Sequence, residues 1–108
     1  MLPSQITSEL AELTQLNRKG VDALFEAEER LAKAEHELDT VEASAFLDAQ
    51  GTVADRQALA RLEAADARLE RDLAKAQVNR VKTKLRVVES EIMSVATRAK
   101  MIQAEMKL

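Results

Sequence analysis

The chain contains no cysteine, tryptophan or tyrosine, and its 108 residues include one proline, two glycines and two phenylalanines. Without cysteine, it can form neither a disulfide nor a metal site built on thiolates. Because aromatic residues make up only 2% of the chain, large side chains for a thick globular core are scarce. The scarcity of glycine and proline leaves long stretches in which a helix meets no interruption.

Long hydrophobic runs are also missing. No segment approaches the roughly 18 consecutive apolar residues that a membrane-spanning helix needs. Residues 1–10 lack the basic start followed by an apolar run that marks a secretory signal peptide. These absences predict a soluble, cytoplasmic protein with no membrane partner.

What is present is typical of long helices, because 32% of the residues are charged and alanine, glutamate, lysine, leucine and arginine are abundant. In the first half, apolar residues alternate at spacings of three and four, which is the heptad pattern of coiled coils. The positions are Leu10, Leu13, Asn17, Gly20, Leu24, Ala27, Leu31, Ala34, Leu38, Val41 and Ala45, with only Asn17 and Gly20 off-type.

The second half has a heptad pattern of its own. It runs through Val78, Val81, Leu85, Val88, Ile92, Val95, Ala99, Ile102 and Met106. Upstream, we follow it from Leu59 through Leu62, Asp66, Leu69, Leu73 and Gln77 to Val81, which requires one irregular 4-4 step.

Gly51 separates the two patterns. A glycine can take the left-handed conformation that closes a helix, and Thr52 followed by Asp55 supplies the cap of a new one. So short a connection makes the two helices antiparallel neighbours, with the stripe of residues 24–45 facing that of residues 59–81.

We therefore predict an all-α fold in which residues 1–108 form one unit, a long, coiled-coil-like antiparallel helical hairpin. Its arms span about 4–49 and 53–107, around a turn at about 50–52. Ser4 or Thr7 is expected to cap the first arm. Gly20 allows a kink or break within residues 17–21, because glycine costs about 1 kcal/mol relative to alanine inside a helix.

The net charge of −3 conceals two oppositely charged halves. Residues 1–50 carry 11 acidic and 4 basic side chains, a balance of −7, whereas residues 51–108 carry 8 acidic and 12 basic side chains, a balance of +4. In one interpretation the arms neutralise each other, with support within a helix from pairs such as Glu26 with Arg30 and Glu29 with Lys33.

In the other interpretation, the second arm offers a basic binding surface. At 100° per residue, its cations fall on one side of the helix beside the apolar seam, with Glu89 as the one acidic interruption. These residues are Arg71, Lys75, Lys82, Arg86, Lys100 and Lys107. Such a stripe is suited to a nucleic-acid backbone.

Nothing in the sequence forms a catalytic or metal-binding constellation. The single histidine, His36, lies outside the seam, and the adjacent Glu35 and Glu37 do not face it on a helix. No serine sits in a nucleophile motif, and the paired carboxylates are those of any exposed acidic helix. We predict no enzyme activity, cofactor, metal or small-molecule substrate. Phe46 is expected to plug the end of the seam at the hairpin tip.

A lone hairpin leaves one flank of each seam uncovered, which predicts a homo-oligomer. The residues expected at the interface between copies are Val81, Leu85, Val88, Ile92, Val95, Ile102 and Met106. Mixed valine, leucine and isoleucine at the seam positions select no particular number of strands.

Two segments carry a family resemblance: AFLDAQGTVADRQALARLEAADARL and, at the C-terminal end, MSVATRAKMIQAEMKL. Over residues 25–108, the order of elements, the Leu-Asp-x-x-x-Gly tip and the amphipathic tail resemble small helical proteins of tailed phages that are similar to UvsY recombination mediators. The family carries basic residues just before the tip, where this chain has Ser44 and Phe46, so that DNA contact does not carry over.

The resemblance implies a phage-encoded, oligomeric accessory factor of DNA recombination in the host cytoplasm. Such a mediator binds single-stranded DNA and helps to load a recombinase by displacing single-strand-binding protein. Here, the DNA-binding residues would be Arg71, Lys75, Lys82, Arg86 and Lys100. The alternative is a structural coiled-coil module, such as a phage assembly or scaffolding component, that binds protein and no nucleic acid.

Overall fold

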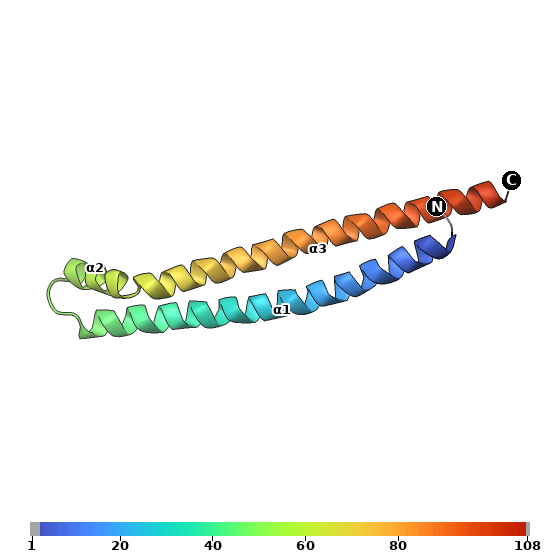
Figure 1. Cartoon of the computed structure of the whole chain (residues 1–108). Coiled ribbons are helices and arrows are strands. Elements are labelled where there is room, and N and C mark those ends of the chain that lie inside the picture. Colours follow the sequence, from blue (N-terminus) through green and yellow to red (C-terminus); the bar gives the residue numbers. More distant parts are fainter. Residues whose placement is uncertain (1–2, 108) are drawn as a thin grey trace. The chain divides into compact units, whose positions relative to one another are not determined.

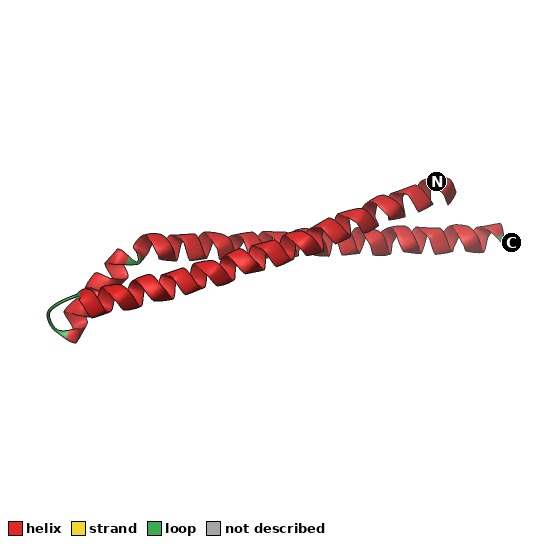
Figure 2. Ribbon diagram, turned by 90° about the horizontal axis from the view of Figure 1, so that it is seen from below, coloured by secondary structure: helices red, strands yellow, loops and turns green. Residues whose placement is uncertain are grey.

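The computed structural model describes residues 3–107 and contains three helices: α1 (Pro3–Asp48), α2 (Val53–Glu63) and α3 (Ala65–Met106). No strand occurs among residues 3–107, so the all-α prediction is confirmed. The chain reverses direction in the loop after α1, and α1 and α3 run alongside each other in opposite directions (Figures 1 and 2). The first predicted arm corresponds to α1, whereas the second is divided into α2 and α3 at Ala64.

Internal contacts group the chain into two compact units, where the sequence predicted one. Unit 1 comprises Met1–Leu24 with Arg80–Leu108, and unit 2 comprises Phe25–Asn79. Each unit therefore contains a segment of α1 and a segment of α3, and unit 2 also contains the tip and α2.

The core of unit 1 is built from large aliphatic side chains. Ile6, Leu13 and Val95 are buried at 5%, 6% and 1% exposure. Partly buried hydrophobic residues pack against them: Leu10, Ile92, Ala99 and Ile102. The predicted heptad positions of both arms thus meet between the helices, and Ile6 extends the first pattern by one step.

Gly20 lies inside this seam and α1 continues through it, so the structure has no break within residues 17–21. A Cβ added at Gly20 would lie 2.5 Å from Cδ2 of Leu85. Because Gly20 has no side chain, it leaves room for Leu85. This packing keeps Gly20 in the helix, although glycine has a low intrinsic helix propensity.

The N-terminal cap predicted at Ser4 or Thr7 is wrong, because α1 already begins at Pro3. Proline suits a first helical position, since its φ angle is preset and its missing N–H would have had no helical partner there. Thr7 lies within the helix, and its Oγ1 donates to the carbonyl oxygen of Pro3 at 3.1 Å.

The seam of unit 2 is made largely of alanine on the side of α2 and α3. Ala60 and Ala64 are 2% and 0% exposed, and from α1 the buried side chains are Ala27, Leu38 and Ala45. The leucines predicted to fill this seam are instead exposed: Leu59 at 45%, Leu62 at 73%, Leu69 at 57% and Leu73 at 59%. That part of the predicted pattern is wrong.

The burial of alanines in place of the predicted leucines has a simple geometric reason. When the heptad pattern is continued from Val78 toward the N-terminus with strictly alternating steps of four and three residues, it passes through buried or half-buried positions. These are Ala74, Arg71, Ala67, Ala64 and Ala60. No irregular step through Gln77 is needed. The seam follows one regular spacing, and the leucines occupy a different side of the helix.

The tip has the predicted cap. Thr52 accepts at its side chain from the backbone N–H of Asp55 (3.2 Å), and the Asp55 carboxylate accepts from the N–H of Thr52 (3.3 Å). Gly51 takes a φ angle of 115°, a left-handed conformation that a residue with a side chain rarely adopts. The predicted roles of Gly51, Thr52 and Asp55 are confirmed.

Candidate nucleic-acid interface

The five residues predicted to bind DNA all lie on α3. Arg71 and Lys75 belong to unit 2, whereas Lys82, Arg86 and Lys100 belong to unit 1. The lysines and Arg86 are exposed, and Arg71 is half-buried at a seam position. The side chain of Arg71 forms an ion pair with its neighbour Asp72, with Nε 2.7 Å from Oδ1.

The remaining four have no counter-ion: among residues 3–107, no carboxylate lies within ion-pair distance of Lys75, Lys82, Arg86 or Lys100. The surrounding sequence favours this arrangement, because residues 73–88 contain five basic side chains and no acidic one. Positive charge on this stretch of α3 is therefore left to solvent or to a ligand.

Pairing between the arms is limited. Within the described residues, two ion pairs join the arms: Arg68 with Glu42 at 3.6 Å in unit 2, and Arg98 with Glu9 at 3.4 Å in unit 1. Within α1, the predicted pair of Glu29 and Lys33 is present at 3.0 Å. The other predicted pair, Glu26 with Arg30, is not formed. Most basic side chains are thus not neutralised by the acidic arm.

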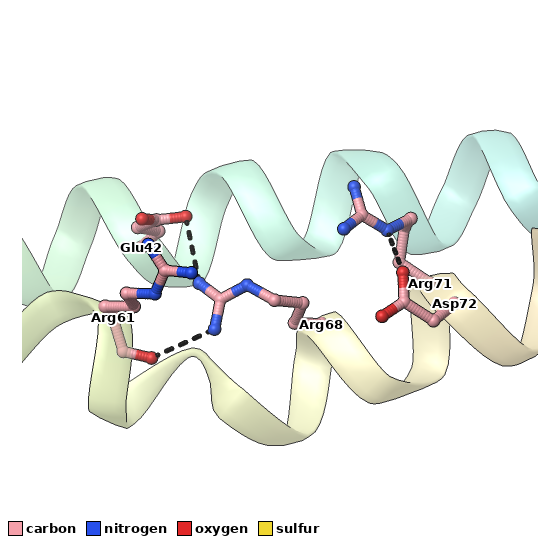
Figure 3. A network of polar contacts seen from close by, with 5 residues as sticks. All are labelled: Glu42, Arg61, Arg68, Arg71 and Asp72. Atoms are coloured by element: carbon pink, nitrogen blue, oxygen red, sulfur yellow. Dashed lines mark hydrogen bonds and ion pairs between the residues drawn. The ribbon is translucent and has the colours of Figure 1, made fainter.

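Arg68 forms one of these ion pairs and also donates a hydrogen bond to a carbonyl oxygen near the end of α2. Figure 3 shows its guanidinium between the two arms, where Nη2 approaches Glu42 of α1 and Nη1 donates to the carbonyl oxygen of Arg61 at 3.3 Å. Since the last carbonyls of a helix lack partners within it, the contact with Arg61 satisfies an acceptor at the end of α2. Arg71, drawn in the same figure, is directed to Asp72.

The two units differ in charge. Unit 1 contains nine basic and six acidic side chains, a net charge of +3. Unit 2 contains seven basic and thirteen acidic side chains, a net charge of −6. Unit 1 is therefore the better electrostatic match for a polyanion.

The residues predicted at an interface between copies are mostly covered within the chain itself. Val81, Leu85 and Val95 are buried, and the structure leaves Val88, Ile92 and Ile102 half-buried. Only Met106 is largely exposed, at 70%. Apart from Met106, these residues pack within the seam of unit 1, and the role of all seven between copies stays a prediction.

Sequence reasoning missed two features of unit 2. Arg56 closes the tip: its Nε and Nη2 donate to the carbonyl oxygen of Phe46 at 3.2 and 3.0 Å, and its guanidinium lies 4.3 Å from the centre of the Phe46 ring. The ring is thus held by a cation–π contact, and its predicted role as a plug of the seam stays a prediction. The second feature is the exposed leucine row, defined as Leu59, Leu62, Leu69 and Leu73.

A groove of about 650 Å³ lies between α1 and α3 in unit 2. Small side chains leave this space, among them Ala27, Ala34, Ala67 and Ala74, and its edges are charged. His36 is exposed, and within residues 3–107 no group of three metal-ligating side chains comes together. In the same part of the chain, no helix has the length and hydrophobicity to cross a membrane.

No protein-family model matches the chain, and neither a curated protein nor a solved structure shows significant similarity to it.

Proposed function

We propose that this chain is a non-enzymatic accessory protein that binds single-stranded DNA through exposed basic side chains of α3. The observation that carries the proposal is the set of four exposed cations without a carboxylate partner: Lys75, Lys82, Arg86 and Lys100. Arg71 contributes less, because Asp72 already neutralises its guanidinium.

The expected mode of binding is electrostatic. Proteins that read single-stranded bases stack them on aromatic rings, and this chain has two phenylalanines, of which Phe46 is covered by Arg56. Binding should therefore depend on phosphate contacts, show little sequence preference and weaken steeply with salt. Lys82 and Arg86 are four residues apart on one side of α3 and can follow a phosphate backbone together.

The wider role rests on the resemblance of residues 25–108 to phage proteins similar to UvsY recombination mediators. In that role, the chain would act as a homo-oligomer that assists the loading of a recombinase in the presence of single-strand-binding protein. The resemblance supplies the partners of this proposal, and the unpaired cations supply its contact surface.

Fluorescence anisotropy with a labelled oligonucleotide, titrated at several salt concentrations, tests the binding. Each phosphate contact adds about 0.7 to the slope of log affinity against log salt for a single strand. We expect the double variant Lys82→Glu/Arg86→Glu to lose most of the affinity and to have a shallower slope. Absence of binding by the wild type at low salt would refute the proposal.

The matched control is Arg18→Glu/Arg30→Glu, which changes the net charge by the same amount at exposed positions of α1 that, like Lys82 and Arg86, form no ion pair within residues 3–107. It should retain much more of the affinity than the α3 variant. Equal losses in the two variants would show that net charge, and not the α3 surface, governs binding.

The exposed leucine row favours the second candidate function, a structural module that binds protein through coiled-coil surfaces. Four exposed leucines at heptad-like spacing along α2 and α3 are more than the scattered apolar residues usual on a surface. This candidate predicts one dominant assembly with no affinity for DNA, so the same titration distinguishes the two.

A further inference from the structure

The leucine row forms a second heptad-spaced surface on unit 2. Leu59 and Leu62 lie on α2 and Leu69 and Leu73 on α3, at successive intervals of three, seven and four residues. Their exposures range from 45% to 73%, so a large part of each side chain is left uncovered by the hairpin. A seam of this spacing is the kind that another helix packs against.

One member of the row, Leu73, also lines the groove between α1 and α3. Leu73 and Glu70 line its α3 side, and Ala27 and Ala34 line its α1 side. The small alanine side chains that line the groove allow an incoming helix to approach closely.

The charges around the row restrict what can cover it. Glu63 and Glu70 directly follow two of the leucines, and Asp66 occupies a heptad position within the row. Residues that flank a coiled-coil seam set the choice of partner through interhelical charge pairs. Two copies of the row packed on each other would bring carboxylates against carboxylates, which favours an apolar and basic occupant over a second row.

Unit 1 carries exposed apolar and basic residues of this kind on both of its helices. Arg80, Lys84 and Val87 are spaced by four and three residues on one side of α3, and Val87 is 52% exposed. On α1, Leu16, 51% exposed, lies three residues before Lys19. These five residues are called the basic face below.

We propose that the leucine row of one copy packs against the basic face of unit 1 in a second copy. The net charges of −6 and +3 for units 2 and 1 make the two surfaces electrostatically complementary. Leu16 and Val87 supply apolar contacts for the leucines, and Lys19, Arg80 and Lys84 face the carboxylates.

This contact does not depend on DNA binding. Arg80 and Lys84 each precede a proposed DNA-binding residue, Lys82 or Arg86, by two positions, which is about 200° around a helix. The two pairs therefore lie on different flanks of α3, and each can be altered separately.

Sedimentation velocity of the full-length chain over a wide concentration range tests the assembly. We expect the wild type to associate with increasing concentration, and Leu69→Ser/Leu73→Ser to weaken association by about tenfold or more. The control Leu47→Ser/Val53→Ser alters residues of unit 2 that are 74% and 60% exposed and lie outside the row. It should associate like the wild type, and circular dichroism should show that both variants remain helical.

A mixing experiment identifies the surface that covers the row. Neither Leu69→Ser/Leu73→Ser nor Arg80→Glu/Lys84→Glu should self-associate strongly, because each lacks one side of the contact. Mixed together, they retain one intact row and one intact basic face, and we expect a one-to-one complex. A wild type that stays monomeric, an Arg80→Glu/Lys84→Glu variant that still self-associates, or a mixture without complex would each overturn the proposal.

Discussion

Units 1 and 2 use the same heptad spacing but place different side chains between their helices. Unit 1 fills its seam with leucine, isoleucine and valine around one glycine, whereas in unit 2 alanine occupies most of the positions on α2 and α3. Unit 2 thus keeps the leucines of α2 and α3 on the outside, where they contribute little to the stability of its own hairpin. The same heptad spacing can therefore place large apolar side chains between the helices, where they stabilise the hairpin, or leave them on an exposed surface.

The largest expected difference between the units comes from truncating a leucine in each. Leu13→Ala in unit 1 removes a side chain that is 6% exposed and should destabilise the chain by about 3 kcal/mol. Leu69→Ala in unit 2 should change stability by no more than about 0.5 kcal/mol, because that side chain is already mostly in solvent. Urea unfolding at high dilution, where copies do not associate, measures both. Equal effects would contradict the comparison.

The second largest expected effect on stability comes from replacing a buried alanine of unit 2 with a larger residue. Ala64 is 0% exposed, so Ala64→Leu must push the helices apart, at a cost of about 2 kcal/mol. Its neighbour Ala65 is exposed, and Ala65→Leu is the matched control with little expected effect. Thermal unfolding followed by circular dichroism detects the difference, and similar melting temperatures for the two variants would show that the seam of unit 2 is loosely packed.

Gly20 allows a test of how tightly the seam of unit 1 is packed. Gly20→Ala gains about 1 kcal/mol of helix propensity but must displace Leu85, whereas in a Leu85→Ala background the gain should be retained in full. A double-mutant cycle should therefore give a coupling of about 1 kcal/mol between the two sites. Additive effects would mean that Leu85 moves aside without cost.

The smallest effects should come from the ion pairs between the arms, and these should be alike in both units. Glu9→Gln in unit 1 and Glu42→Gln in unit 2 each remove the carboxylate of a partly exposed pair, which is worth about 0.5 kcal/mol or less. Urea titrations at low and at high salt should give nearly the same small difference for each. A loss several times larger in one unit would mean that its pair is part of a wider network.

The hydrophobic pattern led to the correct seam in unit 1 but to the wrong residues on α2 and the start of α3 in unit 2, for a physical reason. In unit 1, the most hydrophobic residues coincide with the heptad positions, so following hydrophobicity and following the spacing lead to the same residues. In unit 2, they differ: Leu62 and Leu69 are far more hydrophobic than Ala60 and Ala64, yet the alanines are buried. Strict spacing from Val78 leads to the correct seam, although it passes through the charged Arg71.

The cap at the tip could be predicted because its signals are local: Gly51, Thr52 and Asp55 lie within five residues of one another. The contacts of arginine could not be predicted in this way. Arg56 reaches Phe46 on the other arm, and Arg71 turns to its neighbour Asp72 although it lies in the predicted basic stripe. The partner of a long side chain depends on its rotamer and on the space around it. Neither of these can be read from the spacing of residues along a helix.

The tip loop provides a position for attaching a single label. Gln50 is exposed in the short connection between α1 and α2, and the chain contains no cysteine. Gln50→Cys would therefore create a unique thiol outside both helical seams. A dye or spin label attached there would report on the approach of other molecules to this end of the hairpin, and a maleimide-coated surface would hold every copy by the same point.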